Sequence, residues 1–386
     1  MIISPVNPIS KLNDVGTTIF SIIGQLANEF NAINLSQGSP DFPCSVDLRR
    51  QVELAMQANH NQYAPMTGLP GLKEQISLKI KNLHGQNYDS DEEILITGSA
   101  SQALYSVISA LVKPGDEVIY FEPCFDSYAP IVRLQGAKPV GIKLTVPEFQ
   151  IDWNLVKSVL NTKTKMIILN SPHNPSGSVM SQSDLDILAE LTRETDIIVL
   201  SDEVYEHVIF DGQQHLSMSG HKELAARSVV VTSFGKTFHV TGWRVGCCVG
   251  PAVIMKEVVK VHQFMMFSAD TPMQYAFCEH MKNPVHYLGL SDFYQSKRDL
   301  MTQELKSGPF DILPSHGSFF MLINYGHLTQ KSDSEVVKEL ICKQGVATIP
   351  LSAFYSDGTD NKLLRLSFSK NEQTIIDGVR ALNNFR

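Results

Sequence analysis

The amino-acid sequence predicts an α/β protein with a mostly parallel sheet between helices. Strand-like and helical segments alternate along the chain, which is typical of such a sheet. Several strand candidates are uninterrupted apolar runs, as expected for strands covered on both faces. The chain has 386 residues, so we expect a large and a small domain rather than one simple core.

Seven segments are strand candidates of this sheet. They lie at residues 94–97, 117–121, 139–144, 166–170, 197–201, 229–233 and 245–249. Val245 to Val249 includes Cys247 and Cys248, which we expect to be core thiols.

Helix signals lie between and after these strands. One helix is predicted by an apolar stripe at helical spacing: Leu72, Ile76, Ile80 and Leu83. Another is expected over residues 102–113, where the following Pro-Gly pair stops it. Near the C-terminus, Ser369 and Glu372 have the spacing of a capping box and predict a helix start.

Composition excludes several classes of function. The formal net charge of −8 argues against nucleic acid or an anionic membrane as the main partner. No apolar run has the length of a membrane span. Residues 1–5 lack a basic n-region, so we expect no secretion signal there. The six cysteines form no C-x-x-C pair, and we expect the protein to reside in a reducing cytoplasm. The twelve histidines show no metal-binding spacing, so we expect no metal site.

Distinctive polar residues follow four of the predicted strands. Ser99, Asn174 and Lys236 each follow one strand, and Asp202 and Tyr205 follow another. Ligands of open α/β sheets bind outside the carboxyl ends of the strands. We therefore expect these side chains to form one site.

Lys236 follows the apolar run 229–231, in the sequence Ser-Phe-Gly-Lys-Thr. A buried strand leading into a tight turn can hold a lysine partly desolvated, which lowers its pKa and makes it a reactive amine. A surface lysine is the simpler alternative. A phosphate-binding P-loop is excluded because its first glycine would fall on Val230, and no G-x-G-x-x-G occurs.

Taken singly, the other candidates also have simpler explanations. Ser99 suits a plain helix N-cap, and Asp202 a structural salt bridge. Residues 171–177 suit a turn, Phe125 a core position, and Arg365 the surface of an edge strand.

Residues 233–246, with Lys236 and then Gly-Trp-Arg-Val-Gly, resemble the lysine attachment site of class I pyridoxal-phosphate (PLP) aminotransferases of fold type I. The resemblance runs from about residue 34 to 369. The histidines at positions 173 and 239 make the chain similar to the methionine, kynurenine and glutamine aminotransferase branch of this family.

The family resemblance implies a homodimer. It also implies a large PLP-binding domain over residues 46–285 and a small α/β domain over residues 286–386, which residues 1–45 join.

The resemblance also implies a role for each site residue. Lys236 would carry PLP and then move a proton at the substrate Cα. Asp202 would face the pyridine nitrogen, Tyr205 and Asn174 the phenolic oxygen, and Phe125 the ring. The phosphate would be held by Ser99, Ala100, Ser101, Ser233, Arg244 and, from the partner subunit, Tyr63. Arg365, with Asn174 and the backbone of Gly38, would bind the substrate α-carboxylate.

The function expected from these residues is amino transfer to a 2-oxo acid. Residues 262–272 contain no Arg or Lys where aspartate-specific relatives place a second arginine, which favours apolar, aromatic or thioether donors. The same stretch could instead pack an interface. Alternatives to amino transfer are a PLP-dependent C–S β-lyase, a ligand-sensing regulator, which would need an added DNA-binding domain, and a non-catalytic remnant.

Overall fold

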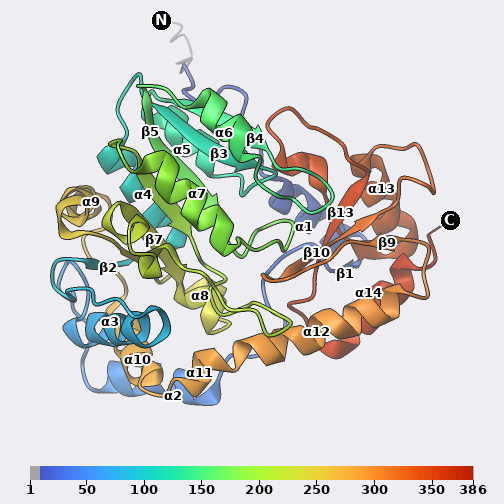
Figure 1. Cartoon of the computed structure of the whole chain (residues 1–386). Coiled ribbons are helices and arrows are strands. Elements are labelled where there is room, and N and C mark those ends of the chain that lie inside the picture. The colour runs from blue at the N-terminus through green and yellow to red at the C-terminus, as the bar shows by residue number, and fades with distance from the viewer. Residues whose placement is uncertain (1–8, 386) are drawn as a thin grey trace, which may run out of the picture.

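The computed structural model describes residues 9–385 (Figure 1). The expectation of a chain start without a secretion signal rests on residues 1–5, which lie outside this range. Among the described residues, none of the helices combines the length and apolarity needed to cross a membrane.

A seven-stranded sheet forms the larger part of the molecule, with the order β2-β8-β7-β6-β5-β3-β4. The strands are β2 (Ile94–Thr97), β3 (Glu117–Glu122), β4 (Lys138–Lys143), β5 (Thr164–Asn170), β6 (Ile198–Asp202), β7 (Ser228–Ser233) and β8 (Gly246–Val249). β8 runs opposite to the other six strands, so its pairs with β2 and β7 are antiparallel and all other pairs in this sheet are parallel. The predicted strands and the mostly parallel sheet are confirmed, with ends shifted by at most two residues.

Helices cover both faces of this sheet, because alternate strand residues point to opposite sides. The helices α4 (Ala100–Leu111), α5 (Tyr128–Leu134) and α9 (Ala252–Met265) pack on the face that contains Leu95 and Cys248. The helices α3 (Pro70–His84), α7 (Gln182–Thr192) and α10 (Thr271–Met281) pack on the face that contains Ile94, Ile96 and Cys247. Both cysteines are buried, as expected of core thiols.

A second, four-stranded antiparallel sheet has the order β12-β13-β10-β9. Its strands are β9 (Asp311–Ile312), β10 (Phe320–Asn324), β12 (Ile349–Pro350) and β13 (Leu363–Ser367), and nearby helices are α12 (Leu290–Leu305), α13 (Asp333–Glu339) and α14 (Glu372–Leu382). The N-terminal segment joins this part through α1 (Ile19–Glu29) and through β1 (Ile33–Asn34), which pairs with β11 (Val346–Ala347). The domain boundaries after residues 45 and 285 stay a prediction.

The predicted capping box at the C-terminal helix is wrong. α14 begins at Glu372 with Asn371 as its N-cap, and Ser369 is buried with its hydroxyl unbonded. Asp41 from the N-terminal segment accepts a hydrogen bond of 2.5 Å from the backbone N–H of Asn371. A tertiary contact thus takes the place of the local cap.

The second predicted helix is displaced by two residues. α4 begins at Ala100 and ends at Leu111, because the Ser99 hydroxyl accepts a hydrogen bond from the N–H of Gln102 and caps the helix earlier than expected. In α3 the predicted stripe is buried except for Leu83, which is 39% exposed.

A buried ion pair anchors the segment that follows β6. Lys79 on α3 lies 2.6 Å from Glu206, and both side chains are buried. Burial by itself would raise the pKa of Glu206, but the charge and hydrogen bond of Lys79, together with the nearby His207 and His215, outweigh it and lower that pKa to about 2. Three residues earlier, Glu203 lies 2.7 Å from His215. The contacts of these two carboxylates therefore hold the turn that contains Tyr205 in position.

We predict that Glu206→Gln lowers the free energy of unfolding by about 3–5 kcal/mol at pH 7, because it leaves the Lys79 ammonium buried without a countercharge. The depressed pKa means that the pair stabilises the fold above the unfolded pKa of about 4.3 and that this contribution is lost as the pH falls toward 2. Urea unfolding of wild type and variant between pH 7 and 3 measures both effects. The control is Glu257→Gln, which breaks an exposed pair with Lys260 and should leave the midpoint unchanged. Equal midpoints for Glu206→Gln and wild type would contradict the prediction.

Candidate active site

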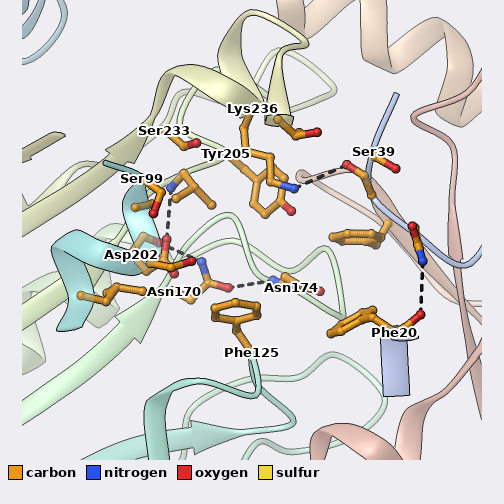
Figure 2. A pocket seen from close by; sticks show the side chains of 18 of the residues that line it. Phe20, Ser39, Ser99, Phe125, Asn170, Asn174, Asp202, Tyr205, Ser233 and Lys236 are labelled. Atoms are coloured by element: carbon orange, nitrogen blue, oxygen red, sulfur yellow. Dashed lines mark hydrogen bonds between the residues drawn. The ribbon is translucent and has the colours of Figure 1, made fainter. Parts of the chain in front are cut away.

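A cavity of about 400 Å³ lies at the carboxyl ends of the parallel strands, between the large and small sheets (Figure 2). Every site residue predicted from the sequence lines it except Tyr63. These residues are Gly38, Ser99, Ala100, Ser101, Phe125, Asn174, Asp202, Tyr205, Ser233, Lys236, Arg244 and Arg365. The structure therefore brings together side chains that are up to several hundred residues apart in the sequence.

Lys236 projects into the cavity from the short helix α8 (Phe234–Thr237) that directly follows β7. Figure 2 shows it across the cavity from Phe125. Its Nζ donates a hydrogen bond of 3.4 Å to the carbonyl oxygen of Gly38. Burial and the positive charge of Arg365 lower the pKa of Lys236 to about 8, against the opposing charge of Asp202. The sequence-based expectation of a depressed pKa is confirmed, and a surface lysine is excluded.

Asp202 ends β6 and is 4% exposed. Its carboxylate accepts hydrogen bonds from the Tyr128 hydroxyl at 2.7 Å and from the backbone N–H of Val204 at 3.3 Å. No cationic side chain forms an ion pair with it within the part of the chain that the structure describes, so the structural salt bridge is not found. Burial raises the pKa of Asp202 to about 6, although the Tyr128 bond opposes this. A cationic ring nitrogen fits this carboxylate.

Asn170 and Tyr128 are site residues that the sequence analysis did not assign. Asn170, the last residue of β5, donates to the carbonyl oxygen of Asp202 and accepts from the N–H of Asn174, each at 2.8 Å. Tyr128 begins α5 and is 2% exposed. An asparagine at a strand end was a usable signal, whereas nothing local indicates that Tyr128 reaches Asp202.

The start of α4 and the segment after α8 form one polar end of the cavity. Ser99, Ala100 and Ser101 lie at the N-terminus of α4, where free N–H groups and the helix dipole favour an anion. Ser99 also caps the helix, so its simpler interpretation holds as well. Ser233 and Arg244 line the same cavity. A Cβ at Gly246 would lie only 2.6 Å from the Ala100 nitrogen, so this glycine permits β8 to approach the turn closely.

Arg365 lies in β13, which is paired on both sides, and the side chain is 1% exposed. The edge-strand interpretation is therefore wrong. The guanidinium donates to the side-chain oxygen of Asn174 and to the carbonyl oxygen of Ser36, each at 2.7 Å, while its Nε has no partner. Burial lowers its pKa, yet it stays protonated at neutral pH. Its hydrogen-bond partners in residues 9–385 are neutral oxygens and include no carboxylate, so the site can accept an anion.

Aromatic rings surround this guanidinium. The Arg365 carbon Cζ lies 3.9 Å from the ring centre of Phe320, 4.9 Å from that of Phe354 and 5.3 Å from that of Phe20. Phe20 and Phe320 also line the cavity. The sequence analysis missed both, because Phe20 lies on the N-terminal helix and neither residue belongs to a recognisable motif.

Tyr63 and residues 262–272 do not line the cavity of their own chain. Tyr63 is 81% exposed and packs edge-on against Phe267, with 5.3 Å between ring centres. Phe264 is 85% exposed. The expectation that this stretch faces the donor side chain is therefore not met within one chain, because the end of α9 carries these residues to the outer surface.

The chemistry of the cavity fits PLP. It offers an amine, a carboxylate without a cationic partner, an aromatic face at Phe125, and hydroxyls with an arginine at a helix N-terminus. These groups match an aldehyde, a basic ring nitrogen, an aromatic ring and a phosphate, respectively. Within the described residues, no group of three or more His, Cys, Asp or Glu side chains could hold a metal ion.

Comparison with known proteins agrees with this chemistry. Residues 31–382 match the family of class I and II aminotransferases. The chain is similar to methionine aminotransferase of Escherichia coli (strain K12), with 44% identity over 98% of both chains. It is also similar to kynurenine–oxoglutarate transaminase 1 of Mus musculus, with 33% identity over 91% of both chains.

Solved structures show the same relationship. An Escherichia coli protein with a methionine aminotransferase function superposes with a TM-score of 0.97 at 44% identity, over 99% of this chain and 100% of the other. The N-succinyldiaminopimelate aminotransferase of Mycobacterium tuberculosis superposes with a TM-score of 0.94 at 31% identity, over 98% and 99%. These relatives are named as aminotransferases, which favours amino transfer over C–S bond cleavage. The chain belongs to the class I and II aminotransferase family and is a PLP-dependent aminotransferase of fold type I.

Proposed function

We propose that the enzyme transfers the amino group of an apolar, aromatic or thioether amino acid, such as methionine, phenylalanine, tyrosine or kynurenine, or that of the uncharged glutamine, to a 2-oxo acid. The observation that carries this proposal is the lining beside Arg365, where Phe20 and Phe320 supply aromatic surface. Over residues 9–385, Lys236, Arg244 and Arg365 are the lysines and arginines that line the cavity. A second carboxylate beside the phenylalanines would have no cationic partner. The methionine and kynurenine relatives support the same donor class.

Bound PLP supplies an electron sink that makes the substrate Cα–H acidic. We assign the cofactor contacts as follows. Ser99, Ala100, Ser101, Ser233 and Arg244 hold the phosphate, Phe125 covers the ring, and Asn174 and Tyr205 contact the phenolic oxygen. Asp202 keeps the ring nitrogen protonated, because a buried carboxylate without a cationic partner favours a cation beside it.

Lys236 is assigned as the attachment residue and as the group that moves the proton at the substrate Cα. A pKa of about 8 leaves the amine close to balance between its two protonation states near neutral pH, as general acid–base catalysis requires. Arg365 binds the α-carboxylate, held in position by Asn174 and assisted by the backbone of Gly38. A fixed guanidinium at one end and Lys236 at the other orient the Cα–H bond.

We further propose that the enzyme is a homodimer and resides in the cytoplasm. Exposed apolar side chains gather near the end of α9, where Tyr63 packs against Phe267 and where Phe264, Met265 and Met266 are also exposed. Contiguous apolar surface of this kind is typical of protein–protein contacts. In the dimer, Tyr63 would reach the phosphate in the partner subunit's cavity. All six cysteines are unpaired, in keeping with a reducing compartment.

The donor class is tested by measuring kcat/KM for methionine, phenylalanine, glutamine, kynurenine and aspartate with several 2-oxo acids. We expect methionine or an aromatic donor to exceed aspartate by at least about tenfold, because a buried unpaired carboxylate costs more than 1.4 kcal/mol. Turnover should require the oxo acid. A value for aspartate equal to that for methionine would overturn the donor class, and pyruvate release without an acceptor would indicate the β-lyase.

Replacing Arg365 tests the carboxylate site. Arg365→Leu should remove about 2–5 kcal/mol of transition-state stabilisation, measured as a fall in kcat/KM, for every amino donor alike, because the α-carboxylate is common to them. The matched control is Arg380→Leu on the exposed side of α14, which should leave the kinetics unchanged. A loss confined to one donor would place Arg365 at the substrate side chain instead.

Mixing two inactive variants tests the shared site. Lys236→Ala lacks the amine, and Tyr63→Ala lacks the proposed partner contact, so each should be impaired at limiting PLP. In a mixed dimer, one cavity combines an intact Lys236 with the partner's intact Tyr63, so unfolding and refolding the two together should restore activity. Restoration is ruled out if Tyr63 serves the cavity of its own chain, since every site would then carry a lesion.

A further inference from the structure

A second cavity of about 500 Å³ adjoins the active-site cavity, with which it shares the lining residue Asn170. Its lining residues come from β5, from the loops after β4 and β5, and from the starts of α6 (Trp153–Val159) and α7, whose places in the fold are labelled in Figure 1. Much of its wall is apolar and aromatic, with Phe121, Phe149 and Trp153 among the lining residues. The Trp153 ring is held in place because its Nε1 donates a hydrogen bond of 2.8 Å to Asp184. This is a concave, largely pre-formed space of the size that small molecules occupy.

The charge of this cavity is one-sided. Glu148 and Asp184 line it, and no lysine or arginine does so in the described chain. His173 and His316 also contribute to the wall. Burial lowers the pKa of His173 to about 4, so it is neutral at working pH. Carboxylates together with aromatic side chains in one wall favour a cation, through charge and through the cation–π interaction.

The second cavity shares a wall with the active site. Asn170 lines both cavities. Tyr128 lines the second cavity, and its hydroxyl donates to Asp202, which lines the first. From Asn170 the hydrogen bonds continue through Asn174 to Arg365. A ligand that presses on the Tyr128 ring therefore acts on the carboxylate of the active site through one side chain.

We propose that the second cavity binds a small organic cation with an aromatic body, and that its occupancy changes the environment of Asp202 through Tyr128. The binding is independent of the donor class proposed above. The effect on Asp202 rests on the proposed role of that carboxylate beside the ring nitrogen. The two parts can therefore fail separately.

Binding is tested by calorimetric titration of the PLP-loaded enzyme with benzyltrimethylammonium. This probe has no N–H bond, so it cannot react as an amino donor. We expect one site per chain, with benzoate binding at least about tenfold more weakly because of the acidic wall. A saturating 2-oxo acid should not displace the probe. Lack of binding, equal binding of benzoate, or displacement by the oxo acid would overturn the site.

Two variants locate the binding. Val179 lines the second cavity and is half-buried, so Val179→Phe should fill part of it and weaken binding by roughly tenfold or more. Val146→Phe adds the same ring on the neighbouring loop, at a position 39% exposed that does not line the cavity, and should bind as wild type does. Equal losses in both variants would place the probe elsewhere. Glu148→Gln should reduce the preference for the cation over benzoate, and an unchanged preference would contradict the charge argument.

The coupling is tested on the absorption spectrum of bound PLP as a function of pH. We expect saturating benzyltrimethylammonium to shift the titration midpoint in wild type, and not in Tyr128→Phe, which keeps the ring but lacks the hydroxyl. An unshifted midpoint in wild type, with binding intact, would refute the coupling and leave the site. Tyr128→Phe should bind the probe with the affinity of wild type, which shows that this variant remains folded around the cavity. Weaker binding by Tyr128→Phe would contradict the assignment of the hydroxyl to coupling alone.

Discussion

The burial of the Arg365 guanidinium is the constraint on which the rest of the cavity depends. Removing a charge from water costs several kcal/mol unless its hydrogen bonds and charge are compensated. The compensation here comes from two neutral oxygens, on Asn174 and Ser36, and from three aromatic rings. These groups belong to the large sheet, the N-terminal segment and the small sheet region. One side chain therefore fixes how three parts of the chain meet, and its charge stays available for an anion.

Asp202 has the complementary position at the other end of the cavity. It is buried and accepts hydrogen bonds, yet no cation pairs with it among residues 9–385. Lys236 lies nearby with a pKa lowered to about 8. Each of these three charged groups is destabilised by burial and relieved by a ligand group of opposite charge or by proton exchange. The site is thus prepared for an amino acid and a cationic aromatic ring before either binds.

Most of the side chains that hold the site residues in place lie outside the cavity, and Asn170 lies at its edge. Glu203 and Glu206 flank Tyr205 in the sequence and are fastened to His215 and Lys79. Tyr128 and Asn170 fasten Asp202 from the side of the second cavity. Tyr205 and Asp202 are consequently held in position by buried polar contacts. A substitution among these supporting residues can therefore alter the active site although the substituted side chain does not contact a substrate.

The sequence by itself determined the seven strands, the Lys236 turn and the polar residues at the strand ends that line the cavity, because these depend on local apolar runs and on turn chemistry, and its resemblance to a family added Gly38, Phe125, Arg244 and Arg365. Only the tertiary structure decided the burial of Arg365, which the sequence of one strand cannot reveal without its neighbours. The same holds for Phe20 at the guanidinium, Tyr128 at Asp202, and the cap of α14, which Asp41 serves in place of Ser369. Local patterns record periodicity and turn chemistry, whereas these contacts join residues that are distant in the chain, and their energy exists only once the chain is folded.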